Sequence, residues 1–186
     1  MVDTGTVSYR KYLSGDDQGM VELIRDYKDG LILYLNNLTG NLQQAEELAM
    51  DTFVHIGIRQ PKNKEKASFK TWLYTIARHL AVDHFRKQRR KREVPLEEGY
   101  GIVDEQACIE RIYKKNQEKL AIHCAMKQLN EAYRQILWLV YFEDLSLKDA
   151  AKIMGKTTRA TETLVYRARL KLKNILLKEG FTYDGL

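Results

Sequence analysis

Apolar residues recur at three- and four-residue spacing along most of this 186-residue chain, which is the period of an amphipathic helix. The stretch Asp17–Leu38 alone places eight apolar or aromatic side chains on one helical face, and Gly40 ends it. Runs of strand-like alternation are few, and only two prolines interrupt the chain. Hydrophobic residues make up 44%, which suffices for a packed core. The sequence therefore predicts an all-α fold.

Residues suited to cap a helix N-terminus precede the apolar stripes and divide the chain into successive helices. A further helix is expected over Ile109–Lys127, and Ser146 with Asp149 three residues later resembles a capping box. The expected capping residues are Asp16 or Asp17, Asn41, Ser68, Asn130, Ser146 and, for the last helix, Thr157 or Thr158.

Charge separates the chain into two basic blocks around an acidic joint. Residues 93–110 carry six acidic and no basic side chains, whereas the chain as a whole has a net charge of +6. Helical periodicity is lost over residues 93–108, which contain Pro95 and two glycines. We predict two small helical domains, residues 1–92 and 109–186, joined by an acidic linker at 93–108. The basic balance permits a polyanionic partner.

The composition also favours one cellular environment. Two cysteines are too few for a disulfide framework and fit a reducing compartment. The N-terminal residues have no apolar core after a basic start, and no apolar run approaches the length of a membrane span. We expect a cytoplasmic protein with no membrane contact of its own.

Residues 147–165 have the pattern of a helix-turn-helix, because a short helix, Leu147–Met154, is followed by a turn at Gly155 and a longer helix. The second helix of such a motif can enter the major groove of DNA, with its first turns at the base edges. The alternative is a helical hairpin whose basic face is only solvated. The candidate contacts are Lys156, Thr158, Arg159, Glu162, Thr163, Tyr166 and Arg167.

The two halves together resemble one known family. The first contains QQAEELAMDTFVHI and SFKTWLYTIARHLAVDHFRKQRRK, and the second contains LNEAYRQILWLVYFEDLSLKDAAKIMGKTTRATETLVYRAR. These stretches resemble the first and last conserved helical domains of bacterial sigma factors. Because no domain separates them, the chain is similar to the small extracytoplasmic-function group over most of residues 8–178. The resemblance implies a protein that binds core RNA polymerase and carries it to promoters, with no catalysis and no cofactor.

The resemblance implies two promoter contacts. The last domain would read the minus-thirty-five element as duplex, through the residues of the helix-turn-helix named above. The first would read and open the minus-ten element, with a pocket for an extruded base and a basic groove for the single strand. Residues implied in this second contact are Lys62, Asn63, Ser68, Phe69, Tyr74, His79, Arg86, Lys87, Arg89 and Arg90.

Three of the implied features allow a second interpretation. Trp72 shares the phase of Phe69, so we expect it in the core rather than as a stacking wedge, and Tyr74 is expected as the exposed aromatic. The basic end Arg86–Arg92 is either a frayed, solvated helix end or a DNA contact, which we favour. The acidic linker is either a solvated tether or, as the family suggests, occupies the path of nascent RNA in polymerase.

The helix with the sequence AEELAMDTF resembles the polymerase-binding surface of the family. Its acidic side chains can pair with basic side chains on a coiled coil of polymerase. The alternative is an ordinary acidic helix face. The candidate residues are Glu46, Glu47, Asp51 and Phe53.

The chain departs from the family pattern at several positions: Met50 and Asp51 stand where Gln and Glu are usual, His79 where Asn is usual, Ala160 where Thr is usual, and Leu164 where Arg is usual. The promoter sequence therefore does not carry over. The family is commonly held inactive by an anti-sigma protein, which is expected as a further partner.

Two other classes of function compete with this interpretation. A stand-alone helix-turn-helix regulator would use the same C-terminal motif on duplex operator DNA, usually as a symmetric dimer. A metal enzyme could use His79 and Asp83, which are one helical turn apart, but no further ligand stands at a suitable spacing. We predict no metal site and no catalytic residues.

Overall fold

The protein was analysed as a computed structural model that describes residues 3–61, 67–92, 122 and 124–178. The described residues form helices and no strand, which confirms the all-α prediction. The linker at 93–108 and most of the helix expected over 109–127 lie outside the described residues. The helical elements are α1 Thr4–Leu13, α2 Gln18–Thr39, α3 Leu42–Arg59, α4 Phe69–Arg92, α7 Glu131–Leu137, the π-helix η1 Trp138–Phe142, α8 Leu147–Met154 and α9 Thr158–Lys178.

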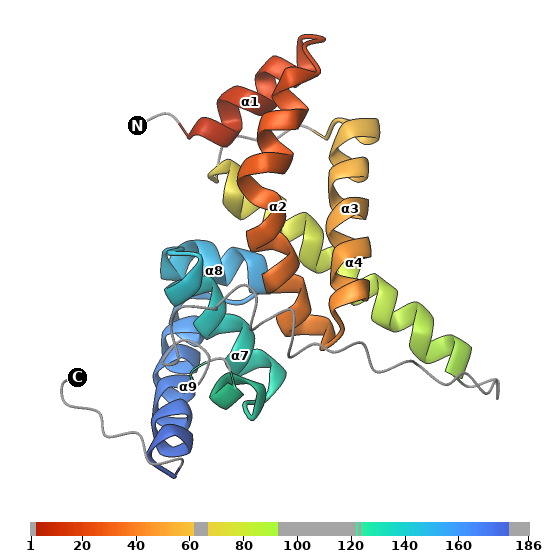
Figure 1. Ribbon diagram of the computed structural model, residues 1–186. Helices are drawn as coiled ribbons and strands as arrows, with labels where there is room; N and C mark the ends of the chain where they lie inside the picture. Colours follow the sequence, from red (N-terminus) through yellow and green to blue (C-terminus); the bar gives the residue numbers. More distant parts are fainter. Residues whose placement is uncertain (1–2, 62–66, 93–121, 123, 179–186) are drawn as a thin grey trace.

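Helix α2 runs through the centre of the N-terminal half, with α1, α3 and α4 packed around it (Figure 1). Its predicted stripe is the reason, because Leu23, Leu31 and Leu35 are fully buried. Burying each such side chain contributes about 1.5–3 kcal/mol relative to leaving it in water. The stripe therefore fixes which face of α2 points inward.

The predicted caps are mostly confirmed. The side chains of Asn41, Asn130 and Ser146 accept hydrogen bonds from the backbone N–H groups of the third residue of their helices, at 3.0, 2.9 and 3.1 Å. Before α2, Asp16 rather than Asp17 provides the side-chain acceptor, to Gln18 N at 2.9 Å. The residues at which these helices begin are thus determined by the local sequence.

Helix α1 was not predicted, because its buried face consists of Gly5, Ser8 and Tyr9 rather than aliphatic residues. Its place is fixed by long-range contacts instead. The Tyr9 hydroxyl donates to Pro61 O at 3.1 Å. Its ring lies 5.1 Å from that of Trp72. Trp72 packs against the core, as predicted.

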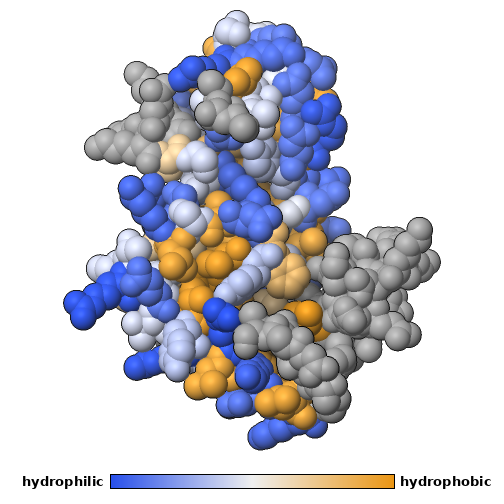
Figure 2. Space-filling model, turned by 90° about the vertical axis from the view of Figure 1, so that its left-hand side faces the viewer, coloured by the Kyte–Doolittle hydropathy of each residue, from blue (hydrophilic) through white to orange (hydrophobic). Residues whose placement is uncertain are grey.

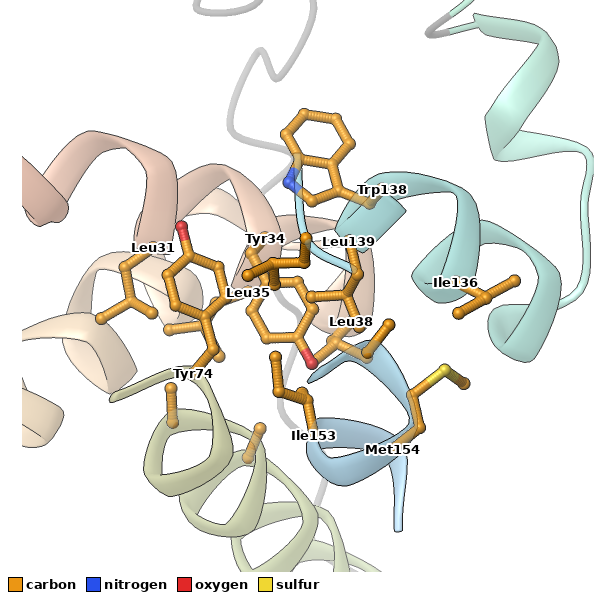
Figure 3. Close-up of a cluster of buried hydrophobic side chains, with 14 of the residues drawn as sticks. Leu31, Tyr34, Leu35, Leu38, Tyr74, Ile136, Trp138, Leu139, Ile153 and Met154 are labelled. Atoms are coloured by element: carbon orange, nitrogen blue, oxygen red, sulfur yellow. The ribbon is translucent and has the colours of Figure 1, made fainter. Parts of the chain in front are cut away.

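The two halves of the chain pack directly on each other. Helix α4 lies against α8, and α2 contacts both α7 and η1. Figure 3 shows the side chains of this junction, where Tyr34 and Leu35 from α2 and Tyr74 from α4 meet Leu139 and Ile153 of the C-terminal half. The sequence predicted two domains on a tether and gave no sign of this shared core.

A close approach between α1 and α2 at Gly19 generates a stability prediction. A Cβ at Gly19 would overlap the Ser8 carbonyl oxygen and lie 2.5 Å from Tyr12 N, so Gly19→Ala must push the helices apart. We expect a loss of about 1–3 kcal/mol in the free energy of unfolding, measured by urea titration. Gly57→Ala is the matched control, because its Cβ would meet only ordinary contacts at 3.5 Å, and it should stabilise by about 0.5–1 kcal/mol. Equal effects of both changes would contradict this account of the packing.

Candidate nucleic-acid interface

Helices α8 and α9 form the predicted helix-turn-helix. Gly155 adopts the left-handed conformation at φ 63° and ends α8, and Lys156 N donates to Ala151 O at 2.9 Å. The motif closes on itself through buried small and aliphatic side chains: Ala150, Ala151, Ile153 and Met154 from α8, and Thr161, Val165 and Ala168 from α9. This packing sets the rotation of α9 and turns its other faces outward.

All seven candidate contacts of the helix-turn-helix are exposed. The Tyr166 side chain is 70% exposed, the highest value among the large aromatic and aliphatic side chains of α9. The Thr163 hydroxyl donates to Arg159 O at 3.2 Å, so it is already engaged within the helix. Leu164, by contrast, packs against the hydrophobic core, which gives a structural reason for its departure from the usual Arg. The first three turns of α9 thus present mainly polar and charged side chains, together with Ala160 and Tyr166.

The candidate minus-ten residues separate into two groups along α4. Ser68, His79, Arg86, Lys87 and Arg90 are exposed. The Ser68 hydroxyl also caps α4, accepting from Thr71 N at 3.2 Å. Lys62, Asn63 and the side chain of Arg89 lie outside what the structure describes.

Two aromatic candidates on α4 are buried. The prediction that Tyr74 is an exposed aromatic is wrong, because its side chain is 1% exposed. It lies off the apolar stripe because it packs against α2, with its ring 5.1 Å from that of Tyr34, and lies next to Glu143 of the C-terminal half. Phe69 is also fully buried, and its ring packs against Tyr9, Tyr27 and Trp72. Neither ring can reach DNA in this arrangement.

Helix α3 carries the candidate polymerase surface. Glu46, Glu47 and Asp51 are exposed, whereas Phe53 is 3% exposed and belongs to the core rather than to the surface. Sequence reasoning missed an exposed apolar ridge beside the acidic face. Met50, Val54 and Ile58 form it, and Ile58 is 80% exposed. Their spacing of four residues, off the buried stripe, was the available signal.

A side-chain contact links α3 to α4, and an ion pair lies within α4 near its end. Gln44 Nε2 on α3 lies 2.6 Å from His84 Nε2 on α4. Arg86 pairs with Asp83 at 3.5 Å, and both are exposed. Such a pair contributes little to stability and leaves the Arg86 guanidinium available to a phosphate.

The described part of the chain holds no group of three or more histidine, cysteine, aspartate or glutamate side chains placed to bind a metal ion. None of its helices combines the length and apolar character needed to cross a membrane.

Comparison with known proteins decides the family. The model for Sigma-70 region 2 matches residues 23–91, and the model for Sigma-70, region 4 matches residues 119–172. RNA polymerase sigma factor YlaC of Bacillus subtilis is 28% identical over 160 residues, covering 84% of this chain and 91% of YlaC. ECF RNA polymerase sigma factor SigW of the same organism is 26% identical over 176 residues, covering 87% and 91%. The chain belongs to the extracytoplasmic-function family of bacterial RNA polymerase sigma factors.

A solved structure shares the fold of this sigma factor. The sigma factor RpoE from Bartonella quintana, in complex with the anti-sigma factor NepR, superimposes with a TM-score of 0.66 at 23% identity. The alignment covers 83% of this chain and 94% of RpoE. Within our sigma factor the region 2 match includes α3 and nearly all of α4, and the region 4 match includes α7, η1, α8 and most of α9.

The exposed face of α9 generates a prediction for this sigma factor. Arg167→Ala removes an exposed guanidinium from the third turn, so it should reduce discrimination between promoter and random DNA by about 1–3 kcal/mol. Lys173→Ala is the control, because it removes the same charge from an exposed position further along α9. It should weaken binding to both DNAs alike. Fluorescence anisotropy on the two DNAs measures both, and equal losses for Arg167→Ala would contradict base reading.

Proposed function

We propose that this protein binds core RNA polymerase and directs promoter-specific initiation, with α9 at the minus-thirty-five element and α4 at the minus-ten element. The observation that carries the proposal is the presence of both sigma-70 regions, in order, on one chain. A stand-alone regulator would need only the helix-turn-helix and gives no account of region 2. The protein acts as an initiation factor rather than an enzyme.

The contact with the minus-thirty-five element uses the polar face of α9. Arg159, Glu162, Tyr166 and Arg167 project from its first three turns, and all are exposed. Arg favours guanine edges, and a Glu accepts from the cytosine amino group. Lys156 and Thr158, at the start of the helix, are placed for a backbone phosphate.

The contact with the minus-ten element uses the exposed part of α4 from His79 onward. Arg86, Lys87 and Arg90 are exposed on the last turns of the helix, and Arg89 lies between them in the sequence. These cations track the phosphates of the strand that opens. Ser68, Lys62 and Asn63 contribute the pocket for an extruded base.

Polymerase docks on α3. Glu46, Glu47 and Asp51 provide the charged rim, and the ridge of Met50, Val54 and Ile58 provides apolar area beside it. An apolar centre with a charged rim is the usual anatomy of a protein interface. The buried Phe53 supports α3 from beneath.

An anti-sigma protein is the proposed regulator, since the similar RpoE was solved in complex with the anti-sigma factor NepR. The protein works in the cytoplasm and on the nucleoid when active, on genes for a stress or envelope signal. The acidic linker occupies the path of nascent RNA.

Run-off transcription with purified bacterial core polymerase tests the function. New transcripts that require this protein, on a library of candidate promoters, are the expected result, and their start sites reveal both elements. If no transcript appears and the protein fails to bind core enzyme, the proposal is overturned in favour of the stand-alone regulator.

The basic end of α4 generates a prediction about salt. Neutralising Arg86 and Lys87 together with Gln should reduce open-complex formation and lower the slope of log affinity against log salt by up to about 2. The control neutralises Arg25 and Lys28, which are exposed on α2. Its slope should match that of the unchanged protein. If both variants give the same slope, the end of α4 does not contact DNA.

A further inference from the structure

A buried carboxylate from the C-terminal half lies against α4. Glu143 is 8% exposed and follows directly after η1. Its Oε2 lies 2.8 Å from Lys70 Nζ, and its Oε1 accepts from Trp138 Nε1 at 3.1 Å. Lys70 Nζ also donates to the Glu143 backbone oxygen at 2.7 Å. One lysine of α4 is therefore held twice by one residue of the other half.

The π-helix η1 builds this position. Glu143 N donates to Trp138 O at 3.1 Å, five residues back, so the turn contains one residue more than an α-helix. Asp144 then adopts a left-handed conformation at φ 51°, which reverses the chain. The Trp138 and Phe142 rings stack at 4.4 Å and stiffen the turn. The carboxylate is thus presented to α4 by local structure of the C-terminal half.

The face of α4 that receives Glu143 contains three groups able to bind an anion. Lys70, Tyr74 and Arg78 follow each other at four-residue spacing and share one side of the helix. Burial, and then the negative charge of Glu143, holds the pKa of Tyr74 well above its usual value. Arg78 Nε is buried and makes no hydrogen bond within the described residues. Among the described residues this guanidinium nitrogen has no acceptor, so it is available to an anion bound on this side of α4.

We infer that Lys70, Tyr74 and Arg78 form a further phosphate-binding site on α4. In the structure described above, where the two halves pack on each other (the closed molecule), Glu143 occupies this site in place of a promoter phosphate. The inference rests on the proposed function of α4 as a promoter-binding helix. Lysine and arginine donate to carboxylate and phosphate oxygens in the same way. Closure and promoter binding therefore compete for the same side chains.

The spacing of the two promoter elements is a separate reason for the halves to open. Elements centred near minus ten and minus thirty-five lie about 25 base pairs apart, or roughly 85 Å along B-DNA at 3.4 Å per base pair. In the closed molecule α8, which leads into the recognition helix, packs on α4 itself. Figure 2 shows hydrophobic side chains gathered across the middle of one face, at the level of α8. The two halves must separate before both elements can be bound.

The test compares Glu143→Gln with Asp144→Asn in the full chain. Both remove one negative charge, at adjacent positions, but only Glu143 touches α4, whereas Asp144 is exposed. Glu143→Gln should increase the radius of gyration measured by small-angle X-ray scattering and tighten binding to a fork-junction DNA at low salt by several-fold. Asp144→Asn should leave the radius unchanged and alter DNA affinity much less.

Lys70→Gln separates opening from DNA contact. It breaks the same ion pair, so it should open the molecule as Glu143→Gln does, but without tighter DNA binding, because a phosphate contact is lost too. If Glu143→Gln leaves both the radius and the affinity unchanged, or if Asp144→Asn tightens binding equally, the inference is overturned. If Glu143→Gln opens the molecule without tightening DNA binding, the proposed phosphate-binding site on α4 is overturned.

An exchange of the two charges is the control for the possibility that a single variant misfolds. Glu143→Lys alone should increase the radius of gyration, and adding Lys70→Glu should restore the compact value while DNA affinity stays low. If the double variant does not restore it, the Lys70–Glu143 ion pair does not hold the two halves together. Helix content from circular dichroism accompanies each variant. The scattering experiment contains no polymerase and no DNA, so its result stands apart from the run-off assay that tests the proposed function.

Discussion

The last turns of α2 are buried on every side, and both halves of the protein depend on them. Five consecutive residues, Tyr34–Leu38, are buried, which a helix shows only when neighbours surround it. Gln135 of α7 donates to the Tyr34 hydroxyl at 3.1 Å, and Arg134 donates to Asn37 O at 2.8 Å. Polar groups thus join apolar ones in holding the C-terminal half against the end of α2. This packing decides which helical faces remain free for partners.

The main consequence of this packing is that some of the proposed binding surfaces are exposed to partners and others are covered. The polar face of α9, the basic end of α4 and the acidic face of α3 are all exposed. Part of α4 is covered by the C-terminal half, because α8 packs on this helix, Lys70 is paired to Glu143 and Tyr74 is buried. In this state the proposed polymerase surface on α3 is exposed, whereas part of the proposed promoter surface on α4 is covered. Opening then becomes a step at which binding energy or a regulator can act.

The sequence predicted the local structure well because caps and stripes are local signals. Asn41, Asn130 and Ser146 cap their helices, and Gly155 turns the helix-turn-helix. Sequence-based prediction failed where contacts between distant parts of the chain determine the structure. Helix α1 has no aliphatic stripe and is held by tyrosine hydroxyls, and Tyr74 is buried by a domain that periodicity within α4 cannot reveal. The π-helix η1, which positions Glu143, has neither a side-chain cap nor a glycine from which the sequence could predict it.

The most direct test of this account is the distance between the two halves in the free protein and in an active complex. Spin labels at Asp29 on α2 and Tyr141 on η1, both exposed and on elements that contact each other, in a chain whose natural cysteines are replaced, report that distance. The account predicts one short distance in the free protein and a much longer one with core polymerase and promoter DNA. The same short distance in a transcribing complex would contradict it.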